Sequence, residues 1–143
     1  MLGSIITTSA GIELFISGTL SLALDDGTDN VSTSTVALDL NTWYHAIIFV
    51  DRSGNAQWYL NGVASGSAPS VTTVAETLTV ANTLMFGANG AGAQPSSSGI
   101  AYLAMWLQDA WLDTHLQATV AQERFNRLIG IHPSKAEGTA IPT

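Results

Sequence analysis

The sequence predicts an all-β protein, an antiparallel β-sandwich with one short C-terminal α-helix. Short segments of alternating apolar and polar residues recur along most of the chain, and turn residues separate them. One segment near the C-terminus has helical periodicity instead. Strands and helices do not alternate, which argues against a parallel sheet built from strand–helix–strand units.

The composition is that of one globular domain with few charges. The chain has 143 residues, of which 46% are hydrophobic and only 10% are charged, where about 25% is typical. With a net charge of −7 and four basic residues, it lacks the positive surface that nucleic acid requires. It has no cysteine for a disulfide or a thiolate site. We expect no signal peptide at residues 1–18 and no membrane insertion, because no apolar run reaches about 18 residues.

The first 40 residues are expected to form short strands. Residues 11–17 and 19–25 flank Gly18, and Leu20, Leu22 and Leu24 alternate with smaller residues, which predicts one buried face. Residues 25–30, Asp-Asp-Gly-Thr-Asp-Asn, interrupt the pattern with turn residues. Residues 32–40 then resume a strand.

A hairpin is predicted over residues 41–62, Asn-Thr-Trp-Tyr-His-Ala-Ile-Ile-Phe-Val-Asp-Arg-Ser-Gly-Asn-Ala-Gln-Trp-Tyr-Leu-Asn-Gly. Its first strand is apolar on both faces, so we expect it to be central and covered on both sides. Trp43 is expected to close the end of the core. Residues 51–55 form the connection, with Gly54 at positive φ, and Asn61-Gly62 predicts a second turn.

Beyond residue 80 the sequence predicts a strand ending at Gly87, a Gly-rich loop over 88–99 and a strand over 100–107. A helix is expected between about residues 113 and 129, ended by Gly130. The apolar stripe of that helix comprises Leu116, Val120, Phe125 and Leu128.

The central hairpin resembles that of concanavalin A-like jelly rolls of the laminin-G type. The matching residues are Trp43, His45, Asp51, Gly54, Tyr59, Asn61 and Gly62. A second match, to the closing strand and short helix of these domains, comprises Gly99, Ile100, Leu103, Trp106, Leu112 and Asp113. The resemblance implies a jelly-roll sandwich over residues 1–130 and an extended tail over 131–143. Only about 40 residues precede the hairpin, so we expect an opening strand to be missing and its place to be open to a strand of another subunit.

The sequence does not predict catalysis. The resemblance extends to glucanases, which place two carboxylates on one strand across a cleft, but their Glu-x-Asp-x-x-Glu pattern is absent here. His45, His115 and His132 do not have the spacing of a metal site. The sequence also lacks the Gly-x-Ser-x-Gly elbow that would present a serine nucleophile to a histidine base. We therefore expect that the protein is not an enzyme.

Two groups of residues are candidate binding sites. Asp25, Asp26, Asp29 and Asn30 offer the hard oxygen ligands that calcium prefers, and the alternative is a solvated turn. No other cofactor is expected. Trp111, Asn89 and Gln94 are candidates for a rim that contacts a ligand or partner, Trp111 by stacking on a sugar ring.

These observations favour a non-enzymatic structural or adhesion module of a larger assembly. The most concrete hypothesis is a phage virion protein, such as a capsid decoration, head fibre or tail component, that forms homo-oligomers or binds capsid or tail proteins. The alternative is a carbohydrate-binding, lectin-like module with a glycan as its partner and calcium as a cofactor. Either would be found on a virion or at a cell surface.

Overall fold

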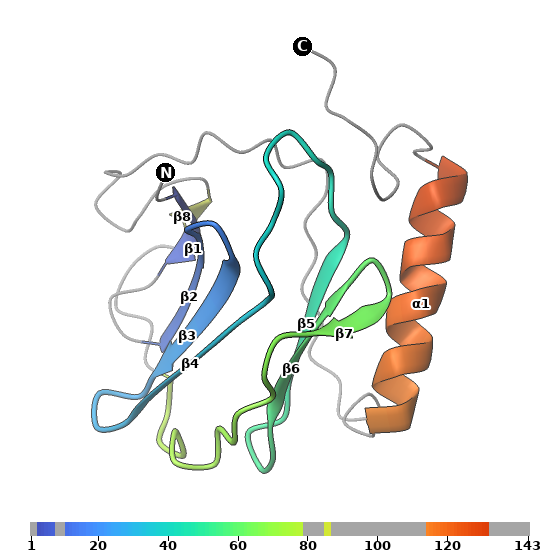
Figure 1. The fold of residues 1–143 in the computed structure, drawn as a ribbon. Helices are drawn as coiled ribbons and strands as arrows, with labels where there is room; N and C mark the ends of the chain where they lie inside the picture. The colour runs from blue at the N-terminus through green and yellow to red at the C-terminus, as the bar shows by residue number, and fades with distance from the viewer. Residues whose placement is uncertain (1–2, 8–10, 79–84, 87–113, 132–143) are drawn as a thin grey trace.

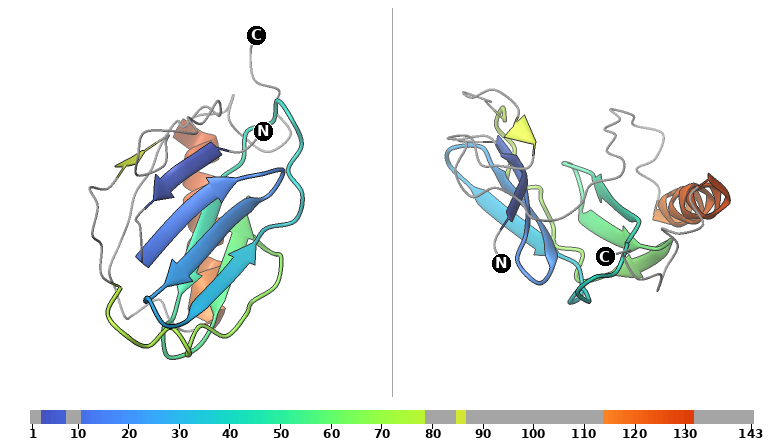
Figure 2. Two further views of the ribbon diagram at one scale, coloured as in Figure 1. Left: turned by 90° about the vertical axis from the view of Figure 1, so that its left-hand side faces the viewer. Right: turned by 90° about the horizontal axis from the view of Figure 1, so that it is seen from above.

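The computed structural model describes residues 3–7, 11–78, 85–86 and 114–131, and these form two antiparallel sheets and one helix (Figure 1). The five-stranded sheet has the order β4-β3-β2-β1-β8, and the three-stranded sheet has the order β5-β6-β7. The helix α1, Thr114–Ile131, lies on the outer side of the three-stranded sheet, so the described elements make three layers (Figure 2). The strands are β1 Gly3–Thr7, β2 Gly11–Ile16, β3 Leu20–Asp25, β4 Asn30–Ser34, β5 Ala46–Val50, β6 Ala56–Leu60, β7 Val63–Ser65 and β8 Met85–Phe86.

The buried face predicted for residues 19–25 is confirmed in β3. Leu20, Leu22 and Leu24 of β3 are all buried, with exposed fractions of 9%, 3% and 2%. Strand β4 starts two residues earlier than predicted and stops at Ser34, so residues 35–40 are not a strand. At this point the Thr35 N–H still donates to the Leu20 carbonyl at 2.9 Å, but the Leu20 N–H donates to the Thr35 Oγ1 at 3.1 Å, and that hydroxyl donates to the Val36 carbonyl at 2.8 Å.

The predicted hairpin is confirmed as β5 and β6, which pair from Ala46↔Leu60 to Val50↔Ala56. Asn61 and Gly62 have φ of 51° and 84°, the left-handed values that a tight turn into β7 requires. The expectation of a positive φ at Gly54 is wrong. A Cβ at Gly54 would come within 2.6 Å of the Asp51 Oδ2, so that carboxylate would have to shift.

Among the described residues, the core between the two sheets includes seven that are buried, namely Leu20, Leu22, Leu24, Ala56, Trp58, Val71 and Val74. Val71 and Val74 belong to residues 66–78, which run along the bottom of Figure 1 between the sheets. We call residues 66–78 the strap. Backbone bonds from Ala56 N to Pro69 O and from Val71 N to Gly54 O, both 3.0 Å, hold the strap against the β5–β6 hairpin.

Beside β4 and β7 the sheets are joined directly, at a contact between residues 33–36 and 65–67 that we call the closed edge. The Thr33 Oγ1 donates to the Ser67 carbonyl at 3.0 Å, and the Val36 N–H donates to the Ser65 Oγ at 3.2 Å. Gly66 has a φ of 73°, and a Cβ there would meet the Ser34 carbonyl oxygen at 1.9 Å. Only glycine permits this approach of two backbones.

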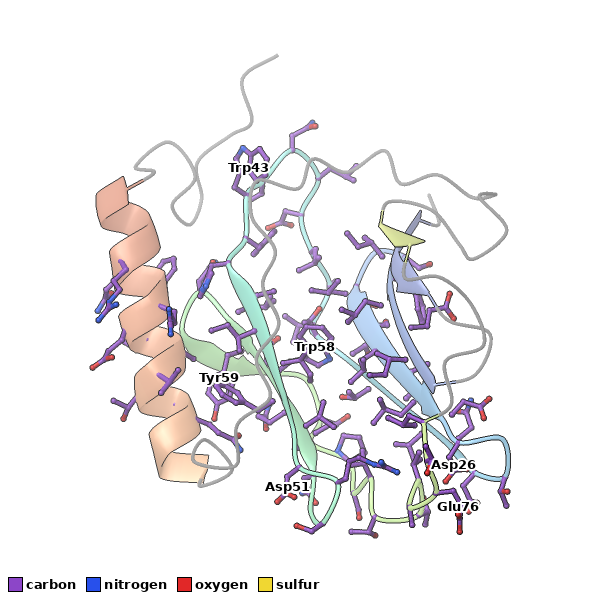
Figure 3. The ribbon with its side chains drawn as sticks, turned by 180° about the vertical axis from the view of Figure 1, so that it is seen from behind. Asp26, Trp43, Asp51, Trp58, Tyr59 and Glu76 are labelled. Carbon is purple, nitrogen blue, oxygen red and sulfur yellow. The ribbon has the colours of Figure 1, made fainter. Side chains whose placement is uncertain are left out.

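Trp58 is the tryptophan that fills the core. It is 2% exposed and lies between the two sheets (Figure 3), and its Nε1–H has no hydrogen-bond partner in the described part of the chain. Trp43 is only partly buried, precedes β5 and belongs to neither core cluster of the described residues. The described contacts do not test the expectation that Trp43 closes the end of the core, and it stays a prediction.

Both faces of β5 are covered, as predicted, although β6 is the middle strand of the three described. Ala46, Ile48 and Val50 face the core between the sheets. Ile47 and Phe49 face the other way, where Phe49 and Tyr59 pack with Ala121 of α1. The predicted helix is confirmed as α1, and both of its ends lie within two residues of the predicted ones. The expectation that Gly130 ends the helix is wrong, because α1 continues to Ile131.

Three expectations lie outside the described residues: the strand over 100–107, the loop over 88–99 and the tail over 131–143 except for its first residue, Ile131, which is the last residue of α1. The side chains of Leu116 and Leu128 lie outside them as well. The domain boundary at residue 130 and the missing opening strand stay predictions.

Candidate functional site

A polar, open depression of about 570 Å³ lies at one end of the sandwich. Loop 26–29 supplies one wall and the end of the strap supplies the other. Figure 3 shows Asp26 and Glu76 close together there. Carboxylates and hydroxyls dominate the lining, which comprises Asp26, Thr28, Asp29, Thr73, Ala75, Glu76 and Thr77.

Asp26 organises this depression. One carboxylate oxygen, Oδ1, accepts the N–H groups of Thr28 at 3.0 Å and Asp29 at 2.8 Å, which shapes the loop. The other, Oδ2, accepts the Glu76 N–H at 3.0 Å and so joins the loop to the strap. The backbone N–H groups of Asp29 and Thr28 lower the pKa of Asp26 below its ordinary value of 3.8, because they stabilise the ionised form.

Arg52 fixes the strap from the other side. From the β5–β6 turn its guanidinium donates through Nε and Nη2 to the Val74 carbonyl, at 3.1 Å for Nε, and through Nη2 to the Glu76 carbonyl. The forked donor geometry of arginine suits this double contact. The positive charge also contributes, more weakly than the hydrogen bonds, to the lowered pKa of Asp26.

Of the four residues predicted as calcium ligands, Asp26 and Asp29 line the depression. Asp25 Oδ1 accepts the Gly27 N–H at 2.7 Å, and Asn30 begins β4 as an exposed residue. The described residues contain no group of three or more acidic, histidine or cysteine side chains placed to hold a metal. The described carboxylates are thus mainly engaged in shaping the turn, and calcium binding stays a prediction.

The predicted rim residues Trp111, Asn89 and Gln94 lie outside the described residues. Conversely, the sequence did not indicate that Glu76, Thr73 and Thr77 belong to the depression. The only signal at these positions is a single acid within a Thr- and Val-rich segment, and its partner Asp26 is 50 residues away in the chain.

A second feature is a set of exposed apolar side chains on the β4–β5 connection and on β7. Among the described residues, the large apolar side chains exposed to solvent are Val36 at 59%, Leu40 at 90% and Val63 at 65%. Val36 and Leu40 belong to the connection from β4 to β5, and Val63 begins β7. The Val36–Ser65 hydrogen bond joins these two segments. We call the three residues the exposed apolar set.

Comparison with known proteins supports the fold described above. The family model described as the concanavalin A-like lectin/glucanases superfamily, of laminin-G type, matches residues 3–108. The chain belongs to this superfamily. The predicted all-β jelly roll is confirmed by the two antiparallel sheets and the match together. No curated protein matches the chain. Within the described residues, no helix is both long and apolar enough to cross a membrane.

Proposed function

We propose that this domain is a non-enzymatic structural or adhesion module, in which copies of the chain pack together within a larger assembly. A phage virion component, such as a capsid decoration, head fibre or tail protein, is the assembly that we favour. The observation that carries the proposal is the exposed apolar set, Val36, Leu40 and Val63, on two segments that the Val36–Ser65 hydrogen bond joins.

The energetics favour covering these side chains. Burying a leucine or valine side chain contributes about 1.5–3 kcal/mol, and Leu40 is 90% exposed. A stable protein interface usually buries more than about 1,000 Å² in total, so the three residues would form the centre of a wider contact. The charged fraction of 10% supports this, because charges are depleted at the centre of interfaces.

The carboxylates of the depression support the non-enzymatic part of the proposal. A glycosidase needs a carboxylic acid with a raised pKa as its proton donor. The pKa of Asp26 is lowered instead, and its two oxygens accept three backbone N–H groups. A residue in this state is ionised at neutral pH and serves to hold the loop.

Light scattering on the purified chain tests the proposal. The wild type should form an assembly larger than the 14.9 kDa monomer. A variant carrying Val36→Ser, Leu40→Ser and Val63→Ser should shift toward the monomer by at least tenfold in dissociation constant. The control is Ala75→Ser, which changes an exposed apolar residue of the strap and should leave the mass unchanged. A wild type that stays monomeric at high concentration, alone and soluble, contradicts the proposal.

A second candidate function is carbohydrate binding, which the depression favours because its carboxylates and hydroxyls can bond to sugar hydroxyl groups. Glycan-array binding that Asp26→Asn and Glu76→Gln both abolish would support this candidate. Loss of glycan binding on addition of a chelator would show that the binding depends on the predicted calcium ion. Absence of binding to any glycan would eliminate it and leave the assembly role.

A further inference from the structure

His45 connects the three-stranded sheet to helix α1. The residue immediately precedes β5, and its imidazole stacks on the Phe125 ring of α1 with centroids 6.1 Å apart and an interplanar angle of 25°. Two bonds to Asn61 fix the His45 backbone: its N–H donates to the Asn61 Oδ1 at 2.9 Å, and its carbonyl accepts the Asn61 N–H at 2.8 Å. The β6–β7 turn therefore fixes the backbone position from which the imidazole projects.

Other side chains of α1 also pack on this sheet. Ala121 is fully buried against Phe49 and Tyr59, Val120 packs against the same cluster, and Phe125 is 7% exposed. Near the turn, Gln122 lies so close to Gly62 that a Cβ there would meet its Oε1 at 2.7 Å. The His45–Phe125 stack is one of several contacts that keep α1 in place, and it includes a titratable imidazole.

The surroundings of the imidazole disfavour a positive charge. Burial lowers the pKa of His45 below its ordinary value of 6.5, and the nearby positive charge of Arg124 lowers it further. Of the other charged residues on the described face of α1, Glu123 and Arg127 are exposed. On the sheet side, the group beside His45 is the uncharged amide of Asn61.

We propose that the His45–Phe125 contact is an acid-sensitive latch, in which protonation of His45 weakens the docking of α1 on the three-stranded sheet. The proton would place a charge in a half-buried site that already faces Arg124. Undocking relieves that cost because the freed imidazole is hydrated. It also uncovers the face that Phe49 and Tyr59 form, so acid would convert a covered sheet face into an apolar surface.

The sign of the pH dependence follows from linkage. The pKa of His45 is lower with the helix docked than with it free, so the undocked form binds the extra proton. Docking is therefore fully stable above about pH 6.5 and is lost progressively as the pH falls below that value. For a single proton, the docking equilibrium changes by up to about tenfold per pH unit.

Amide hydrogen exchange between pH 7.5 and 5.0 tests the latch. Protection factors in residues 117–127, corrected for the intrinsic pH dependence of exchange, should fall by up to about tenfold per pH unit below 6.5. Amides of the β2–β3 hairpin should keep their protection. Equal loss in both regions, or no loss in the helix, would overturn the proposal.

Variants separate the latch from other titrating groups. His45→Phe keeps a stacked ring without a titratable group, and His45→Gln keeps a neutral polar side chain, so both should remove the pH-dependent loss from the helix. Arg124→Met should make the loss smaller, because the docked pKa rises toward its ordinary value. The controls His115→Gln and His132→Gln should retain the full loss. If the helix of both His45 variants still loses protection as the wild type does, the latch is refuted, whatever the oligomeric state.

Discussion

Replacing Gly66 by alanine tests the closed edge at a single atom. The added Cβ would lie 1.9 Å from the Ser34 carbonyl oxygen, well inside the 3.4 Å at which ordinary van der Waals contact begins. The next nearest atoms are also backbone, the Ser34 carbonyl carbon at 3.0 Å and the Thr35 Cα at 3.3 Å. No side-chain rotation can relieve this contact, so β4 and the start of the strap must move apart.

Two costs contribute to the expected loss of stability. The first is the positive φ of 73°, which costs an alanine about 1–2 kcal/mol. The second is the backbone displacement, for which overpacking suggests about 1–3 kcal/mol. Alanine also restricts the unfolded chain, which returns about 0.4–1 kcal/mol. We therefore expect Gly66→Ala to lower the free energy of unfolding by about 2–4 kcal/mol.

Gly18 provides a matched control. Its φ of 75° is nearly the same, but a Cβ there meets nothing within 4 Å, so Gly18→Ala bears only the first cost and should lose about 1 kcal/mol. Urea unfolding followed by the fluorescence of buried Trp58 measures both variants. Equal losses for the two, with unchanged denaturant slopes, would refute the close approach of Ser34 and Gly66.

Three further predictions concern the core and the depression. Trp58→Ala should lower the free energy of unfolding by about 3–5 kcal/mol, measured by thermal or urea unfolding. Trp58→Phe should change it by no more than about 1 kcal/mol, because this variant also removes an unpaired buried N–H. A similar large loss for both variants would contradict the prediction. Arg52→Lys should cost about 1–2 kcal/mol in urea unfolding through the lost forked contact with Val74 and Glu76, and an unchanged midpoint would reject it. Because the folded pKa of Asp26 is lowered, its contribution to stability is present above about pH 3.8 and is lost as the pH falls further. The acid unfolding profile of Asp26→Asn should lack that contribution. A profile identical to that of the wild type would contradict the prediction.

Local patterns made much of the fold predictable. The alternation of Leu20, Leu22 and Leu24 identified a buried face without reference to any other strand. Asn61-Gly62 identified its turn, since few residue pairs tolerate two left-handed conformations in succession. The leucine alternation and the Asn-Gly pair both depend only on residues close together in the chain, so the sequence alone is sufficient to identify them.

Long-range contacts were not predictable in the same way. Gly54 and Gly66 are both glycines of turns, but a Cβ at Gly54 would meet a side-chain carboxylate three residues away, whereas a Cβ at Gly66 would meet backbone 32 residues away. The depression needs Asp26, Arg52 and Glu76 together, and no spacing in the sequence indicates that the strap passes between a loop and a hairpin. The acids at 25–30 were identified as a candidate site, whereas the opposite wall was not.

The most direct test of the account is electron cryomicroscopy of the purified chain under the conditions in which light scattering measures its mass. We predict repeated copies of a two-sheet sandwich in contact through Val36, Leu40 and Val63, each side chain buried between subunits. Isolated single domains, or an assembly that leaves those three side chains in solvent, would contradict it.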